Sequence, residues 1–169
     1  MLEAVQGDIT QQSDITAIVN AANAQLAPGG GVAGAIHRAA GPNLFDECKK
    51  MTPIRPGEAV ISAAYNLPNK YVIHALGPVY GMDKPENVLL ADCYRNTLIL
   101  AEEKNIDSVA FPAISTGAFG YPFEAATDIA LQTVIDIAPD LNNIKVIRFV
   151  LFGDIDYEIY VERMRTIRE

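Results

Sequence analysis

A glycine-rich stretch between residues 20 and 41 constrains the fold of this chain more than any other feature. An apolar run, Ala17–Val19, leads into it, and three consecutive glycines occupy positions 29–31. Glycines allow the backbone to turn with positive φ, and they allow a ligand to approach without meeting a Cβ atom. The residues from Val32 to Ala40 are small and tolerate a helix. We therefore predict a strand, a turn and then a helix that begins at the glycines.

The predicted helix start is a candidate binding site. It would direct free N–H groups and the positive end of the helix dipole at any group bound in the turn. This arrangement indicates an anion site and favours phosphate. Asn20 and Asn23 lie beside it, at the end of the predicted strand, where neutral amides suit a sugar or an ester. A tight connection that binds nothing is the alternative, and this stretch alone supports both interpretations equally.

The spacing G-x-G-x-x-G, beginning at Gly29, also matches the dinucleotide fingerprint. That fingerprint needs its first glycine at the strand end and an acidic residue about 20 residues later, on the next strand. Here eight residues separate Asn20 from Gly29, and the next acidic residues, Asp46 and Glu47, lie in a predicted helix. We therefore reject a Rossmann interpretation.

Length and charge limit the possible functions. The 169 residues suffice for one domain with a substantial core, and 50% of them are hydrophobic, as in an α/β protein whose sheet is covered on both faces. The formal net charge of −8 argues against broad nucleic-acid binding, which needs a basic surface. A nucleotide ligand is compatible with this charge, because main-chain N–H groups bind phosphate without Lys or Arg.

The two cysteines, Cys48 and Cys93, are isolated in the sequence. Without a CxxC pair or a neighbouring histidine they predict packed, reduced thiols, and neither a disulfide nor a zinc site. No other metal and no cofactor is indicated. No apolar run approaches the length of a transmembrane helix, and a strand predicted from Leu2 leaves no room for a signal peptide. We therefore expect a cytoplasmic protein without a membrane partner.

Strand-like and helix-like segments alternate along the chain. Apolar runs predict strands at residues 2–7, 17–20, 58–63, 71–76, 108–111 and 146–152. Periodicity and composition predict helices that include residues 32–40, 42–48, 90–101, 126–137 and 157–164. The acidic residues Asp154, Asp156 and Glu158 fall where the last helix begins, and carboxylates there suit the helix dipole. This alternation predicts a three-layer α/β/α sandwich, with residues 1–169 as one domain.

A second loop of small residues, Ala113–Pro122, follows a predicted buried strand and precedes a helix. It contains no lysine, so it is not a Walker loop. In an open α/β sheet, ligands bind beyond the carboxyl ends of the strands, so the two glycine loops can face each other across one crevice and hold a diphosphate with amide N–H groups. Phe119 and Tyr121 could wall one end, or they could simply pack as loop aromatics.

The arrangement of these motifs resembles the macrodomain family, and most closely its stand-alone MacroD-type enzymes. The resemblance is carried by Gly7–Thr10, Ala17–Asn23, Gly29–Val32 and Ala113–Pro122, and it extends through Tyr71–His74 and Gly77–Pro78 over essentially the whole chain. It implies an α/β/α sandwich with a mixed central sheet. It also implies ADP-ribose as the ligand and, for many members, hydrolysis of ADP-ribosyl esters.

By the same resemblance, Asp8 accepts a hydrogen bond from the adenine amino group, and the backbone of Ile9 meets the ring. An acceptor-only carboxylate suits an exocyclic NH₂ donor. Phe152 matches the aromatic residue that stacks on adenine. Without the family, Asp8 is a turn-forming residue and Phe152 a core residue at a strand end.

The resemblance places the diphosphate and the distal ribose at the two glycine loops. The residues implied to hold the diphosphate are Val32 and the loop of Ser115, Thr116, Gly117, Ala118, Phe119 and Gly120. Asn23, together with Asn20, is implied to fix the distal ribose hydroxyls. Gly30 and Gly31 would lie near the anomeric carbon, and Phe119 would border that ribose. The implied catalytic residues are therefore Asn23, Asn20, Gly30 and Gly31.

One position departs from the family pattern. MacroD-type hydrolases typically carry an Asp, the usual candidate for activating water, where this chain has Ala33. A methyl group can neither orient water nor take a proton. Losing a general base typically costs about 10²–10⁴-fold in rate, yet some members with this Val-Ala-Gly sequence are active. In those, the substrate phosphate and the loop backbone are inferred to hold the water.

We therefore expect an ADP-ribosyl ester hydrolase that resembles O-acetyl-ADP-ribose deacetylases. Candidate substrates are mono-ADP-ribosylated acidic side chains, O-acetyl-ADP-ribose and ADP-ribose 1''-phosphate, so the expected partners are ADP-ribosylated proteins or free ADP-ribose derivatives. A non-catalytic ADP-ribose reader is the competing hypothesis, and an unrelated nucleotide-binding enzyme is a weaker one. His37 and His74 lie in apolar segments, which is typical of packed, hydrogen-bonded histidines and not of catalysts.

Overall fold

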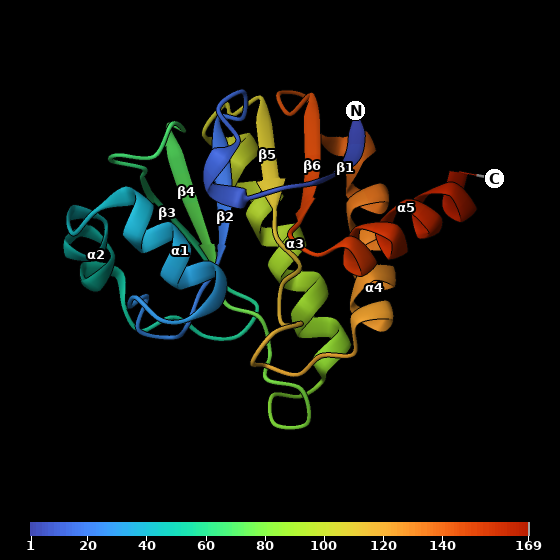
Figure 1. Cartoon of the computed structure of the whole chain (residues 1–169), viewed down its shortest axis with the longest axis horizontal. Helices are drawn as coiled ribbons and strands as arrows, with labels where there is room; N and C mark the ends of the chain where they lie inside the picture. Colours follow the sequence, from blue (N-terminus) through green and yellow to red (C-terminus); the bar gives the residue numbers. More distant parts are fainter. Residues whose placement is uncertain (169) are drawn as a thin grey trace.

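The computed structural model describes residues 1–168, in which helices cover both faces of a six-stranded sheet (Figure 1). The strands are β1 (Leu2–Gln6), β2 (Ala17–Ala21), β3 (Ala59–Ala63), β4 (Tyr71–Ala75), β5 (Ser108–Phe111) and β6 (Val146–Leu151). The α-helices are α1 (Gly31–Ala40), α2 (Asn43–Cys48), α3 (Glu86–Glu103), α4 (Phe123–Ile137) and α5 (Asp154–Arg168).

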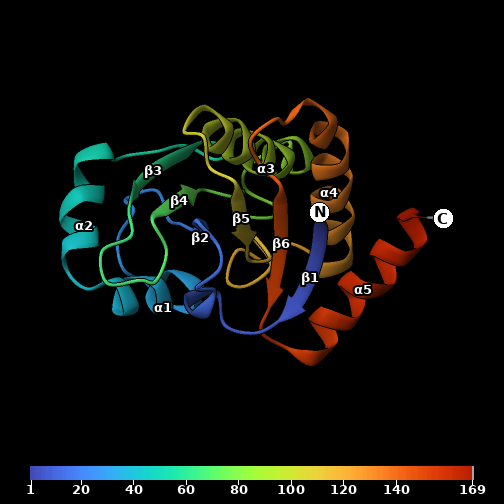
Figure 2. The same ribbon diagram turned by 90° about the horizontal axis from the view of Figure 1, so that it is seen from above.

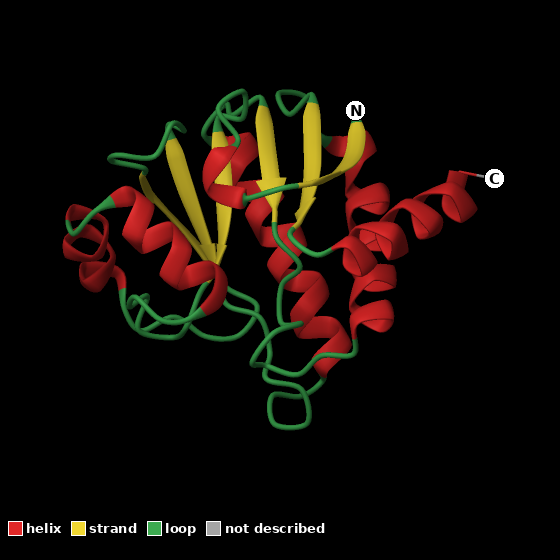
Figure 3. Ribbon diagram, viewed as in Figure 1, coloured by secondary structure: helices red, strands yellow, loops and turns green. Residues whose placement is uncertain are grey.

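The sheet has the strand order β1-β6-β5-β2-β4-β3. All neighbouring strands are parallel except β3 and β4, which pair antiparallel because only a short connection joins them. The sheet is therefore mixed, as the macrodomain resemblance implied. β2 and β5 are adjacent in its middle, so the glycine-rich segments that follow these two strands leave the sheet side by side (Figure 3).

Each face of the sheet has its own hydrophobic core, because successive side chains of a strand point to opposite faces. On β2, Ile18 packs into the cluster beneath α1 and α2, and Val19 packs into the cluster beneath α3 and α4. Figure 2 shows these two helix pairs on opposite sides of the strands, with α5 beside β1. The predicted three-layer α/β/α sandwich is thus confirmed.

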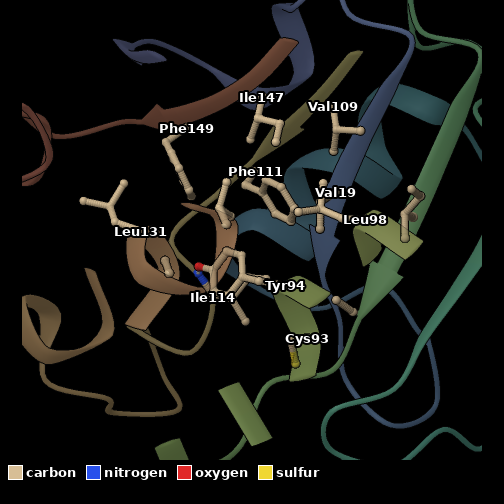
Figure 4. Packing of buried hydrophobic residues seen from close by; sticks show 14 of the residues in the cluster. Val19, Cys93, Tyr94, Leu98, Val109, Phe111, Ile114, Leu131, Ile147 and Phe149 are labelled. Carbon is tan, nitrogen blue, oxygen red and sulfur yellow. Dashed lines mark hydrogen bonds between the residues drawn. The ribbon is translucent and has the colours of Figure 1, made fainter. Parts of the chain in front are cut away.

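Buried aromatic rings fill the core under α3 and α4 (Figure 4). Tyr94 of α3 lies 5.1 Å from Phe111 of β5, and Phe149 of β6 lies 4.9 Å from Tyr160 of α5, between ring centroids. The Tyr94 hydroxyl accepts a hydrogen bond of 3.3 Å from the main-chain N–H of Ile114. This bond connects the aromatic core directly to the loop that follows β5.

The predicted strands and helices all form, with ends that differ from the prediction by a few residues. α5 begins at Asp154 and carries Asp154 and Asp156 in its first turn, as predicted from the helix dipole. Short 3₁₀ turns at Ile9–Gln11, Lys49–Met51 and Ala138–Asp140 were not predicted. Within residues 1–168, no helix combines the length and apolar character needed to cross a membrane.

Candidate functional site

The loops after β2 and β5 enclose a cavity of about 330 Å³ at the carboxyl edge of the sheet. This is where ligands bind in open α/β sheets. The cavity is lined by Ala21, Ala22, Asn23, Gly29, Gly30, Gly31, Val32, Ala33, Gly77, Ala113, Ile114, Ser115, Gly117, Ala118 and Phe119. Both glycine-containing loops singled out in the sequence therefore line one cavity. Tyr121, expected to wall one end with Phe119, is not among the lining residues.

Helix α1 begins at Gly31, as predicted, and its first turn opens into the cavity. The main-chain N–H groups of residues 31–33 donate to no acceptor in the described chain, whereas the N–H of Gly34 donates to Gly30 O at 3.2 Å. Gly34 is buried, and a Cβ atom on it would lie only 2.3 Å from Gly29 O. The glycine loop therefore packs directly on the backbone of the helix that it precedes.

The loop after β5 is held open by its own hydrogen bonds. Tyr121 N donates to Ser115 O at 2.9 Å, Gly120 N donates to Gly117 O at 3.0 Å, and the Thr116 hydroxyl donates to Ala113 O at 2.9 Å. The main-chain N–H groups of residues 115–119 have no acceptor within residues 1–168. Consecutive free amides of this kind form a concave anion-binding surface.

Ser115 has an unusual backbone and an unpaired side chain. Its φ of +68° is rare for a residue other than glycine, and its buried hydroxyl has no partner among the described residues. The side chain lies against Gly77, where a Cβ atom would be 2.0 Å from Ser115 Oγ. A buried, unpaired hydroxyl in a cavity wall suits a hydrogen bond to a ligand. The Gly77-Pro78 pair carried part of the family resemblance, but its contact with Ser115 was not predicted.

None of the described lining residues has an ionisable side chain. The positive potential available to a bound anion therefore comes from main-chain N–H groups and from the N-terminal end of the α1 dipole. The same fact excludes a lining carboxylate or histidine from proton transfer within the described cavity wall. Ala33, the position at which the sequence departs from the resemblance to MacroD-type enzymes, is buried in this wall.

Asn23 lines the cavity and is fixed by the turn that it closes. Its Nδ2 donates to Ala27 O at 2.9 Å, and its Oδ1 accepts from Ala27 N at 3.0 Å. An amide carries two N–H donors and two acceptor lone pairs, so one of each is left for a ligand. A side chain held in this way can orient a sugar without first losing rotamer entropy.

Asn20, which we expected to help to fix the ribose, is not among the residues that line the cavity. On β2 its side chain points to the same face as Ile18, and only 1% of its surface is exposed. Its Nδ2 lies 3.0 Å from His74 Nδ1, and its Oδ1 is buried without a partner among the described residues. The two asparagines differ because the strand ends between them, at Ala21. The motif Asn-Ala-Ala-Asn by itself does not show where the strand ends.

The residues expected around adenine lie farther along the same edge of the sheet. β1 pairs with β6, and Gly7 N donates to Leu151 O at 2.9 Å, so Asp8 and Phe152 follow directly from paired strand ends. From β1 to β2 there are three strand spacings, or about 14 Å. Neither Asp8 nor Phe152 lines the cavity described above.

At this end of the site the Asp8 side chain is held by hydrogen bonds, whereas the Phe152 side chain is exposed to solvent. Asp8 Oδ1 accepts hydrogen bonds from the main-chain N–H of Thr10 at 2.9 Å and from its hydroxyl at 2.6 Å, so it caps the turn at Ile9–Gln11. Its Oδ2 has no partner in the described chain and can accept a further donor. Phe152 is 85% exposed. The alternative interpretation, a core residue at a strand end, is therefore wrong.

The histidines and cysteines lie away from the cavity. Burial lowers the pKa of His74 to about 3, and the ring is hydrogen-bonded between Asn20 and Ser62, as predicted for a packed histidine. Burial also lowers the pKa of His37, but its ring nitrogens have no partner within residues 1–168, so the predicted hydrogen bonds are wrong there. Both cysteines are buried free thiols, and burial raises the pKa of Cys48 to about 11.

An open α/β sheet with a cavity between two glycine loops at its carboxyl edge is typical of α/β proteins that bind nucleotides. The sequence model described as "Macro domain" matches residues 19–130, and this chain belongs to the macro domain family. Its relatives include MacroD-type proteins.

Two such relatives carry names that describe an activity. Human ADP-ribose glycohydrolase MACROD2 is 47% identical over 165 residues, covering 94% of this chain and 38% of that protein. An O-acetyl-ADP-ribose deacetylase of Salmonella newport is 54% identical over 140 residues, covering 80% of this chain and 78% of that protein. Among solved structures, a variant of the Oceanobacillus iheyensis macrodomain with ADPR superposes with a TM-score of 0.93 at 41% identity, covering 98% of this chain and 92% of that one.

Proposed function

We propose that this chain binds ADP-ribose along the carboxyl edge of its sheet, with residues 1–169 acting as one macrodomain. The observation that carries the proposal is the two sets of main-chain N–H groups, at residues 31–33 and 115–119, that have no acceptor within residues 1–168 and border one cavity whose described lining residues include no ionisable side chain. Such a site suits a diphosphate held by main-chain amides. The macrodomain structure with ADPR supports this choice of ligand.

In this proposal each residue has a role set by its place along the edge. Asp8 Oδ2 accepts from the adenine amino group, the Ile9 backbone meets the ring, and the exposed Phe152 ring stacks on it. Gly31, Val32 and the loop from Ser115 to Gly120 hold the diphosphate. Asn23 orients the distal ribose, with Gly30 and Gly31 near its anomeric carbon and Phe119 at its border. Asn20 has no direct role.

We further propose that the protein hydrolyses ADP-ribosyl esters at the distal ribose. Water adds the elements of H and OH across the ester, so that a carboxylic acid or phosphate leaves and the ribose hydroxyl is restored. Because Ala33 offers no base, the substrate phosphate and the loop backbone hold this water, and positioning and charge stabilisation supply the rate. The names of the glycohydrolase and deacetylase relatives support a hydrolase.

The candidate substrates are mono-ADP-ribosylated Asp or Glu side chains, O-acetyl-ADP-ribose and ADP-ribose 1''-phosphate. The proposed partners are accordingly ADP-ribosylated proteins, and the cytoplasm is the location that we predict. The absence of a base at position 33 favours one competing function, a reader that binds ADP-ribose without turnover.

Calorimetric titration with ADP-ribose tests the proposed ligand, and incubation with a mono-ADP-ribosylated protein tests turnover. Binding together with release of the label, lost in Asn23→Ala, supports the hydrolase. Binding without release supports the reader. A heat signal with ATP or NAD but none with ADP-ribose refutes both and favours an unrelated nucleotide-binding enzyme.

A further inference from the structure

The loop between β4 and α3, residues 76–85, forms part of the rim of the cavity. Tyr80 N donates a hydrogen bond of 2.8 Å to the carbonyl of Phe119, and Phe119 lines the cavity. The Tyr80 ring lies against the Tyr121 ring, with centroids 4.9 Å apart. Figure 1 shows this loop extending beyond the sheet beside the loop that follows β5. The two loops are therefore fixed to each other next to the proposed ribose end of the site.

Carboxylates order this rim loop internally. Asp83 Oδ2 accepts a hydrogen bond of 2.8 Å from Val79 N, and Glu86 Oε2 accepts one of 3.2 Å from Gly81 N. The N–H groups of Met82 and Asp83 both donate to Val79 O at 3.0 Å. The tip of the loop is thus held by polar bonds in addition to the contact between the Tyr80 and Tyr121 rings.

Two large apolar side chains of this ordered loop face solvent. Met82 is 79% exposed and Tyr80 is 47% exposed. Neither lines the cavity, so neither is placed to contact the part of ADP-ribose that the cavity would hold. These two exposed apolar side chains stand two residues apart on an ordered loop at the edge of the cavity, where a partner bound at the cavity can bury them.

We propose that Tyr80 and Met82 bind the polypeptide that flanks an ADP-ribosylated side chain, so that the protein binds a modified peptide more tightly than free ADP-ribose. This inference rests on the proposed function. With the distal ribose bordered by Phe119, as in the proposed function, Tyr80 is bonded to the residue next to its substituent. An acetyl group adds only two carbon atoms beyond the ribose oxygen, whereas a peptide extends by about 3.3 Å per residue. A thioether and an aromatic ring select an apolar neighbour of the modified residue.

Calorimetry with two ligands tests this surface. One ligand is free ADP-ribose, and the other is a peptide that carries a single ADP-ribose through a hydrolysis-resistant linkage, with leucine beside the modified residue. We expect the wild-type protein to bind the peptide about 5- to 30-fold more tightly than free ADP-ribose, from burial of one or two apolar side chains. The double variant Tyr80→Ser/Met82→Ser should bind both ligands equally, with unchanged affinity for free ADP-ribose.

Ile99→Ser is the matched control, because Ile99 is 42% exposed on α3 and does not line the cavity. It should keep the peptide preference. Equal wild-type affinities for the two ligands, or a preference that persists in the double variant, overturn this proposal and leave the proposed function intact. Failure of the wild-type protein to bind free ADP-ribose overturns both. If the double variant also loses affinity for free ADP-ribose, the single variant Met82→Ser is measured instead, because Met82 is the more exposed of the two residues. A Met82→Ser protein that keeps the full preference for the peptide overturns the proposal.

Discussion

Replacing Gly34 by alanine is predicted to destabilise the protein, although alanine is the better helix former. In an exposed helix interior this exchange stabilises by about 1 kcal/mol. At Gly34 the new Cβ would lie 2.3 Å from Gly29 O, more than 1 Å inside an ordinary van der Waals contact. Both atoms belong to rigid backbone, so no side-chain rotation relieves the clash, and overpacking of this kind costs about 3 kcal/mol. The expected net loss is about 2 kcal/mol.

For a chain of 169 residues this loss lowers the melting temperature by roughly 4–8 °C. Because the clash pushes the glycine loop away from the helix, the amides that border the cavity shift, and ADP-ribose affinity should fall as well. Thermal melts and calorimetry measure the two effects. Ala39→Gly, at an exposed position of the same helix, calibrates the propensity difference. A melting temperature that rises in Gly34→Ala would refute the close packing of loop on helix.

Three further predictions follow from the site and the core. Ala33→Asp should raise turnover of a mono-ADP-ribosylated protein by about 10-fold or more, since it supplies a base beside the cavity; unchanged single-turnover rates would argue against any need for one. The pKa of His74, lowered to about 3 by burial, lies below its unfolded value near 6.5, so the stability it contributes is present above pH 6.5 and is lost as the pH falls toward 3. Urea unfolding should therefore show a loss on the order of 2 kcal/mol from pH 8 to pH 5, and a His74→Asn variant, compared with its own stability at pH 8, should lose less. Tyr94→Phe removes the acceptor of the buried Ile114 N–H, which should cost about 1–3 kcal/mol and weaken ADP-ribose binding; a variant with full stability would show that this bond contributes little.

The layer order and most element boundaries were predictable because they depend on local patterns. The apolar run at Ala17–Val19, the glycines after it and the small residues of α1 each indicate their own structure without knowledge of the rest of the chain. Which residues line the cavity depends on where each strand ends. Asn20 falls inside β2 and turns into the core, whereas Asn23 falls after it and lines the cavity.

Contacts between distant segments could not be predicted from the sequence. Gly77 lies against the hydroxyl of Ser115, and Tyr80 bonds to Phe119, across separations that no local pattern records. His37 was expected to be hydrogen-bonded because buried imidazoles usually are, yet its ring nitrogens have no partner among the described residues. The sequence shows which residues are apolar or flexible, but tertiary packing decides which of them meet.

A binding site built from main-chain N–H groups affects which sequence changes the protein can accept during evolution. Every residue type except proline offers the same N–H, so most exchanges of side chain around the cavity leave the donors in place. Substitutions are not tolerated at positions where the backbone conformation depends on the residue, such as Gly77, which packs against Ser115. Drift in sequence should therefore alter the neighbours of the nucleotide long before it abolishes capture of the nucleotide itself.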